Sequence, residues 1–86
     1  MPTISEFFGI TIRMYYDDHA SPHFHAYYGG HAAVIEIKTL QLKEGELPRR
    51  ALALTLEWAS YHRQELITDW KLAEEHRPLN PIAPLE

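Results

Sequence analysis

Four of the chain's six histidines lie within residues 17–31, together with two aspartates. This stretch holds the run His23-Phe24-His25 and ends in Gly29-Gly30-His31. Imidazole and carboxylate groups bind metals such as zinc and nickel, and imidazole also transfers protons near neutral pH. Any chemistry that this protein performs is therefore predicted here.

A divalent metal site is the first possibility. His23 and His25 are two residues apart, so on a strand their side chains point to the same side, and Glu36 is predicted across from them. His19 or an aspartate of the preceding loop would complete a set of three or four ligands for zinc or nickel. The helical zinc motif His-Glu-x-x-His is absent. The alternative is that these are surface histidines.

Chemistry without a metal is the second possibility. A sheet face that carries both histidines with an arginine and two tyrosines would hold a phosphate, orient a hydroxyl and move protons. The catalytic candidates are Arg13, Tyr15, His23, His25 and Tyr27. The substrate of such a site would be RNA, by analogy with other small sheet proteins. The formal net charge of −4, with scattered Lys and Arg, counts against binding a phosphate backbone.

Two strands around Gly29-Gly30 must position these residues. Residues 23–28 and 31–37 flank the two glycines, a spacing that predicts a hairpin whose paired residue numbers sum to 59. Residues 10–16 alternate apolar and polar side chains, which predicts a further half-buried strand. With a two-residue turn, His23, His25, Tyr27 and Glu36 share one face with Arg13 and Tyr15. A one-residue slip would exchange the faces.

The rest of the chain is expected to cover the other face. Residues 1–8 read as a lead-in, and residues 39–45 as a third reversal with a short strand. No Gly or Pro occurs from 49 to about 75, where apolar residues recur at helical spacing and predict one long helix. The predicted core comprises Ile10, Ile12, Met14, Phe24, Ile35, Ile37, Leu52, Leu56 and Leu66. Residues 77–86 contain three prolines and are predicted to form an extended tail.

Together these elements predict an α+β fold in one domain spanning residues 1–86. The sheet would be small and antiparallel with three or four strands, and one long C-terminal helix would pack on one face. A chain of 86 residues buries a marginal core, and without cysteine it has neither disulfides nor thiolate zinc sites. We therefore expect a protein partner or a homodimer. No apolar run is long enough to span a membrane and no targeting signal is present, so the expected location is the cytoplasm.

The chain resembles a family of small bacterial proteins classed as a domain of unknown function (the DUF family numbered forty-one sixty). The resemblance covers nearly the whole chain and rests on residues 1–9, Arg13-Met14-Tyr15, Asp18-His19, Pro22-His23-Phe24-His25, Glu44 to Pro48, Trp58, His62 and the Pro78 to Leu85 tail. Two positions depart from the family pattern: Ser21 replaces a proline, and Leu40 replaces a glycine.

The resemblance implies a member of a two-gene module similar to a toxin–antitoxin pair, and it brings no catalytic residues. We therefore expect a protein-interaction component whose histidine-rich sheet face is the working surface. The alternative is a small RNA-directed or metal-assisted hydrolytic enzyme that uses the same face.

Overall fold

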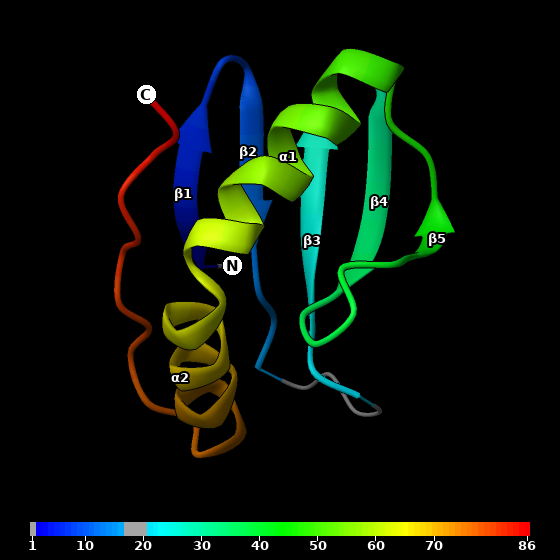
Figure 1. Cartoon of the computed structure of the whole chain (residues 1–86). Helices are drawn as coiled ribbons and strands as arrows, with labels where there is room; N and C mark the ends of the chain where they lie inside the picture. Colours follow the sequence, from blue (N-terminus) through cyan, green and yellow to red (C-terminus); the bar gives the residue numbers. More distant parts are fainter. Residues whose placement is uncertain (1, 17–20) are drawn as a thin grey trace.

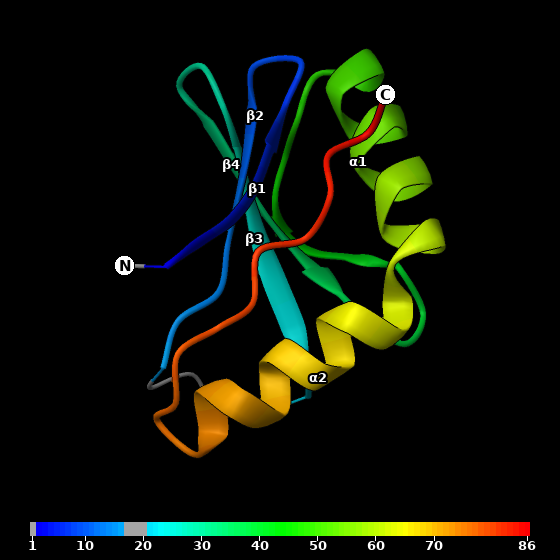
Figure 2. The same cartoon turned by 90° about the vertical axis from the view of Figure 1, so that its left-hand side faces the viewer.

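The computed structural model of the chain describes residues 2–16 and 21–86. Five strands form one antiparallel sheet in chain order: β1 (Thr3–Phe7), β2 (Ile10–Arg13), β3 (His23–Tyr28), β4 (His31–Glu36) and β5 (Leu42–Gly45). Two helices follow, α1 (Arg49–Tyr61) and α2 (Arg63–Glu74), on one side of the sheet (Figures 1 and 2). The predicted α+β class and antiparallel sheet are confirmed. The predictions of three or four strands and of one long helix are wrong.

The strand that sequence patterning missed is β1. Phe8 and Gly9 connect it to β2, and both have positive φ, 49° and 81°, as a tight hairpin turn requires. The register of β1 shifts between Thr3 and Ser5, so that Ile4 and Ser5 are both buried in succession. This irregularity breaks the alternation of buried and exposed residues by which a strand is recognised.

The hairpin of β3 and β4 has the predicted turn. Gly29 takes φ +57°, and the pairs run from Tyr28 opposite His31 to His23 opposite Glu36. Every pair sums to 59, so the predicted two faces of the hairpin are confirmed. Phe24, Ala26 and Ile35 are buried on the face toward the helices.

The predicted third reversal and short strand are also present. The turn before β5 places Leu40 at φ +59°, a left-handed conformation that glycine adopts with less strain. Leu40 donates its backbone N–H to the carbonyl oxygen of Glu36 at 2.9 Å, which closes the turn without that glycine. At the end of β5, Gly45 approaches the carbonyl oxygen of Ala32 so closely that a Cβ would overlap with it.

The helical segment divides at His62, whose φ of −126° and ψ of 24° are not helical. A straight rod of about 27 residues would be roughly 40 Å long, whereas the whole fold measures 33 × 25 × 22 Å. The break lets each half keep its apolar side on the core, because Trp58 before it and Leu66 after it are both fully buried. The side chain of Glu65, in the first turn of α2, meets His62 Nδ1 at 2.6 Å.

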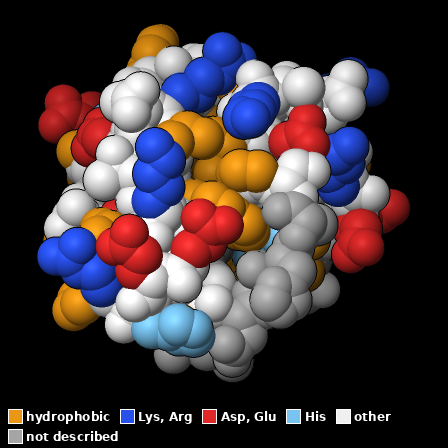
Figure 3. Space-filling model, turned by 90° about the horizontal axis from the view of Figure 1, so that it is seen from below, with side chains coloured by type: hydrophobic (Ala, Val, Ile, Leu, Met, Phe, Trp, Pro, Cys, Tyr) orange, Lys and Arg blue, Asp and Glu red, His pale blue; other side chains and the backbone are white. Residues whose placement is uncertain are grey.

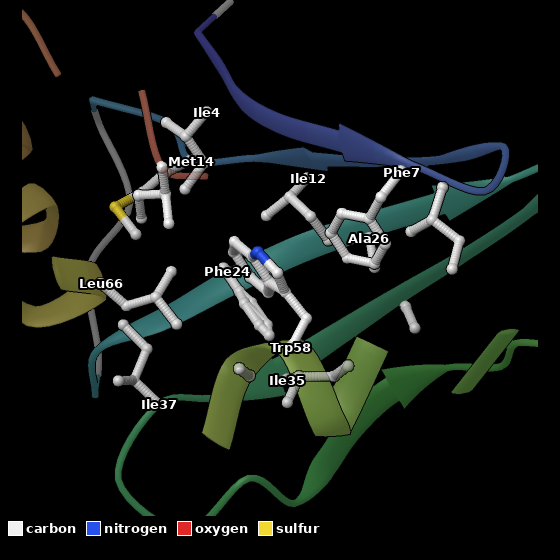
Figure 4. Packing of buried hydrophobic residues seen from close by; sticks show 14 of the residues in the cluster. Ile4, Phe7, Ile12, Met14, Phe24, Ala26, Ile35, Ile37, Trp58 and Leu66 are labelled. Carbon is white, nitrogen blue, oxygen red and sulfur yellow. The ribbon is translucent and has the colours of Figure 1, made fainter. Parts of the chain in front are cut away.

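The core lies between the sheet and α1, with Trp58 at its centre (Figure 4). Its ring packs 5.3 Å from the ring of Phe7 and 5.9 Å from that of Phe24, measured between centroids. The buried side of α1 is formed by Ala51, Thr55, Trp58 and Ala59. Leu52 and Leu56, which we predicted to be buried, are only half-buried because they lie beside this buried side and not on it.

Beyond α2 the chain runs back beside β1 as an extended segment, which we call the tail (residues 77–86; Figure 1). Its Ile82 is buried and donates its backbone N–H to the carbonyl oxygen of Ile4 at 2.7 Å. Trp58 Nε1–H donates to the carbonyl oxygen of Ala83 at 2.8 Å. The tail therefore covers the outer edge of β1 and completes the core.

Candidate functional site

The helices cover one face of the sheet and leave the other uncovered, as Figure 2 shows; we call it the open face. Strand pairing places side chains from four strands in one row across it, because Arg13 pairs with His25, His25 with Val34, and Val34 with Glu44. Neighbouring positions of the same face add Tyr15, Tyr27, His23 and Glu36. The predicted site residues of the described strands therefore share one surface.

Four of these side chains form a ring cluster, defined as Arg13, Tyr15, His25 and Tyr27. The imidazole of His25 meets the Tyr15 ring edge-on at 4.5 Å and stacks near Tyr27 at 6.4 Å, measured between centroids. The hydroxyls of Tyr15 and Tyr27 are hydrogen-bonded to each other. The Arg13 guanidinium lies 5.3 Å from the centre of the Tyr27 ring. All four are half-buried, so they are held in place while part of each stays accessible.

His23 extends the ring cluster toward the lower end of the sheet. Its ring lies 5.2 Å from that of His25 and 5.0 Å from that of Trp70, which comes from α2 where this helix passes the end of the sheet (Figure 2). His23 Nδ1 donates to the carbonyl oxygen of Ser21 at 2.9 Å. A carbonyl only accepts, so neutral His23 carries its proton on Nδ1 and its lone pair on Nε2.

Glu36 lies directly across from His23 but is held by the turn that follows β4. Thr39 Oγ1–H donates to Glu36 Oε1 at 2.7 Å, and Lys43 Nζ lies 3.7 Å from Oε2. The hydrogen bond from Thr39, followed by the charge of Lys43, lowers the pKa of Glu36 against the opposing effect of desolvation. Glu36 is therefore an ionised carboxylate at neutral pH.

The metal prediction remains a prediction. The structure brings His23, His25 and Glu36 to one face as expected. Within residues 2–16 and 21–86, however, no group of three or more His, Cys, Asp or Glu side chains is arranged to hold a metal ion. His19, the fourth predicted ligand, lies outside the described residues. A metal site here would thus depend on a donor from residues 17–20.

A shallow hollow of about 240 Å³ opens beside the ring cluster, between His25 and the end of β5. It is lined by residues 32–34 of β4 and by Glu44 and Gly45 of β5. The open face therefore combines aromatic rings, an arginine at one side and a carboxylate at the other. Such a surface suits an amphipathic protein partner.

At the lower end of the molecule, apolar side chains gather between charged ones (Figure 3). The half-buried ring of Tyr16 stacks on that of His76, with 6.1 Å between the two centroids. In the described part of the chain, no helix is sufficiently long and apolar to cross a membrane.

Sequence reasoning missed one buried carboxylate, Asp69 of α2. Its Oδ1 accepts the backbone N–H of Asn80 at 2.9 Å, while its buried Oδ2 has no hydrogen-bond partner among the described residues. Burial raises the pKa of Asp69, and the nearby charge of Glu65 adds to this, against the hydrogen bond from Asn80. The helical spacing did hold a signal, since Asp69 lies three residues after Leu66 and four before Ala73, on the apolar side of α2.

Comparison with known protein families identifies a matching family model. The model described as "Domain of unknown function (DUF4160)" matches residues 9–71, which include β2 to β5, α1 and most of α2. No match was found among curated proteins or solved structures.

Proposed function

Because the chain belongs to the family described as a domain of unknown function (DUF4160), we propose its function from the open face: it is a protein-interaction module that docks a partner protein there. The partner we propose is the second product of a two-gene module of the toxin–antitoxin type. The observation that carries this proposal is the half-buried ring cluster on an uncovered sheet face.

The residue types of the open face favour protein binding. Tyrosine and arginine are enriched among the residues that dominate the energy of protein interfaces. Here Tyr15, Tyr27 and Arg13 already contact one another or His25, so little conformational entropy is lost when a partner binds. Val34 and Ala32 add apolar surface beside these residues.

The edges of the sheet favour docking on the face rather than the addition of a strand. The tail occupies the outer edge of β1 through the hydrogen bond between Ile82 and Ile4. At β5 the register shifts at Lys43, which lies between the residues paired with Val34 and Ile35. Short, charged and irregular edge strands are poor templates for pairing with another chain.

The experiment is coexpression of this chain with the product of the adjacent gene, followed by size exclusion with light scattering and by calorimetric titration. Tyr27→Ala is expected to weaken the complex at least tenfold, the effect typical of an interface hot spot. Gln64→Ala, on the exposed surface of α2, is the matched control. Equal affinity for both variants would contradict the open face as the docking surface, and absence of any complex would contradict the two-gene pairing.

A second candidate is a small RNA-directed or metal-assisted hydrolytic enzyme, favoured by the contacts of His25 with Tyr15 and of Arg13 with Tyr27. The carboxylates of Glu36 and Glu44 share this face and repel phosphates, which places this candidate second. Cleavage of a labelled RNA by wild type and not by His25→Ala would favour it. Titration with zinc and nickel at pH 7.5 and 5.5, on wild type and on a His23→Ala, His25→Ala variant, separates the metal-assisted form, because protonated imidazole does not bind metal.

A further inference from the structure

Prolines and large apolar residues each recur in the tail with a period of three residues. Pro78, Pro81 and Pro84 are exposed, whereas Leu79, Ile82 and Leu85 are half-buried or buried. Three residues per turn is the period of the polyproline II helix, which has no internal hydrogen bonds and is recognised through its side chains and carbonyls. The tail thus has the pattern of a docked proline-spaced ligand joined to its own receptor.

The receptor groove for this ligand is built from three elements. Ile4 of β1 accepts a hydrogen bond from Ile82, Asp69 of α2 accepts one from Asn80, and Trp58 of α1 donates one to Ala83. Two of these bonds join the tail to elements far away in the sequence, and the third joins it to α2, eleven residues before Asn80. A tail from a second copy would therefore make the same three hydrogen bonds and bury the same Ile82.

The link between α2 and the tail is strained. The N–H groups of His76 and Arg77 donate to the carbonyl oxygens of Ala73 and Leu72, at 3.1 and 2.9 Å, as in a Schellman motif. That motif needs a left-handed residue, normally glycine, and here His76 takes φ +56°. The closed position of the tail is thus held against a local conformational cost that an opened link does not have.

We propose that the tail is exchanged between two copies of this chain. The link opens at His76, residues 77–86 dock in the groove of the second copy, and the second copy returns its tail to the first. The result is a symmetric dimer in which every tail contact is kept and both strained residues relax. The groove lies beside β1 and the helices and is not part of the open face (Figure 2).

The concentration at which the monomer converts to the exchanged dimer follows from two quantities. A short link holds the tail near its own groove at an effective concentration of about 1 mM. Relaxation of one left-handed residue lowers the concentration needed for dimer formation by about tenfold, and each of the two copies contributes such a factor. We therefore expect the wild-type dimer to form above roughly 10 µM chain, with a slow approach to equilibrium because the tail must first be released.

The test uses two substitutions at the link in the full chain. Proline cannot adopt φ +56°, so His76→Pro is expected to be dimeric at about 5 µM, with twice the chain mass of 10.0 kDa by light scattering. Glycine adopts it freely and so removes the strain from both copies, and His76→Gly is therefore expected to shift the dimer to about a hundredfold higher concentration. A folded His76→Pro monomer, or an unchanged midpoint for His76→Gly, overturns the proposal.

If His76→Pro does not fold, disulfide cross-linking between two cysteine variants tests the exchange instead. Thr68 on α2 and Asn80 on the tail line one cavity, and the chain has no native cysteine. A Thr68→Cys chain mixed with an Asn80→Cys chain at about 200 µM in a thiol–disulfide buffer is expected to form a cross-linked heterodimer. The control adds Ile82→Asp to the Asn80→Cys chain, which removes the buried anchor of the tail. Absence of the heterodimer, or equal yield with the control, overturns the exchange.

Discussion

The backbone N–H of Asn80 donates a 2.9 Å hydrogen bond to Oδ1 of the fully buried Asp69, so a carboxylate of α2 holds the start of the tail. The other carboxylate oxygen is buried without a hydrogen-bond partner among the described residues. One ionisable group therefore fixes the tail and at the same time destabilises the fold whenever it is charged.

Asp69→Asn is expected to stabilise the protein at pH 7 by about 1 kcal/mol, because it keeps an acceptor for Asn80 and removes a buried charge. Desolvation raises the folded-state pKa of Asp69 above its unfolded value. The folded state therefore binds the proton first as pH falls, and wild-type stability is lost as pH rises through the folded-state pKa. Urea denaturation at pH 7 and pH 4 should show that the advantage of the Asp69→Asn variant shrinks at the lower pH; a constant difference would contradict this.

Trp58→Ala is expected to cost about 3–5 kcal/mol of unfolding free energy, because it empties the centre of the core and frees the Ala83 carbonyl. Leu52→Ala, on the same helix but only half-buried, is expected to cost about 1 kcal/mol. Denaturant midpoints of the two variants provide the comparison. Similar losses would mean that the packing side of α1 is not the one described.

Phe8→Asn is expected to raise stability by about 1 kcal/mol, since Asn tolerates the left-handed region and Asn-Gly is the preferred pair for such a hairpin turn. Phe8 has φ 49° and a side chain that is 59% exposed, so little burial is lost. Thermal melting is a sufficient measurement, with Glu6→Asn, an exposed position of β1, as the control. A lower melting temperature for Phe8→Asn would show that the ring contributes more than the strain costs.

Thr39→Val is expected to raise the pKa of Glu36, because the Thr39 hydroxyl is the largest cause of its lowering. When the pKa of a carboxyl group is lower in the folded state than in the unfolded state, the ionised group stabilises the fold at pH values above the unfolded-state pKa. That stability is lost as pH falls through the folded-state pKa. Carboxyl-carbon NMR of Glu36 during an acid titration measures the shift directly. Thr39→Ser keeps the hydroxyl and should titrate like wild type.

Much of the open face could be predicted because a single local signal determines it. Two glycines between two short runs fix the hairpin register, and the register then decides which side chains share a face. His23, His25, Tyr27 and Glu36 followed from that one turn, and Arg13 from the alternation along the strand before it. Their contacts with Tyr15 and Trp70 did not, since ring geometry depends on how β2 and α2 pack against the hairpin.

The remaining errors arise where tertiary packing decides between locally similar sequences. The segment around His62 contains neither Gly nor Pro, and its break follows from the size of the sheet that the helices must cover. The strand β1 is hidden by its register shift, and the burial of Asp69 depends on a tail eleven residues later in the chain. Neither the break at His62 nor β1 has a periodic signature.

The tail is also synthesised after the strands and helices that it contacts. Residues 77–86 leave the ribosome after every strand and helix that they cover. In a nascent chain the outer edge of β1 and the Trp58 indole therefore still lack their hydrogen bonds to the tail. Such intermediates are prone to associate with one another through exposed strand edges and apolar surface. The outer edge of β1 and the Trp58 indole are therefore covered only once Ile82 and Ala83 have left the ribosome and docked.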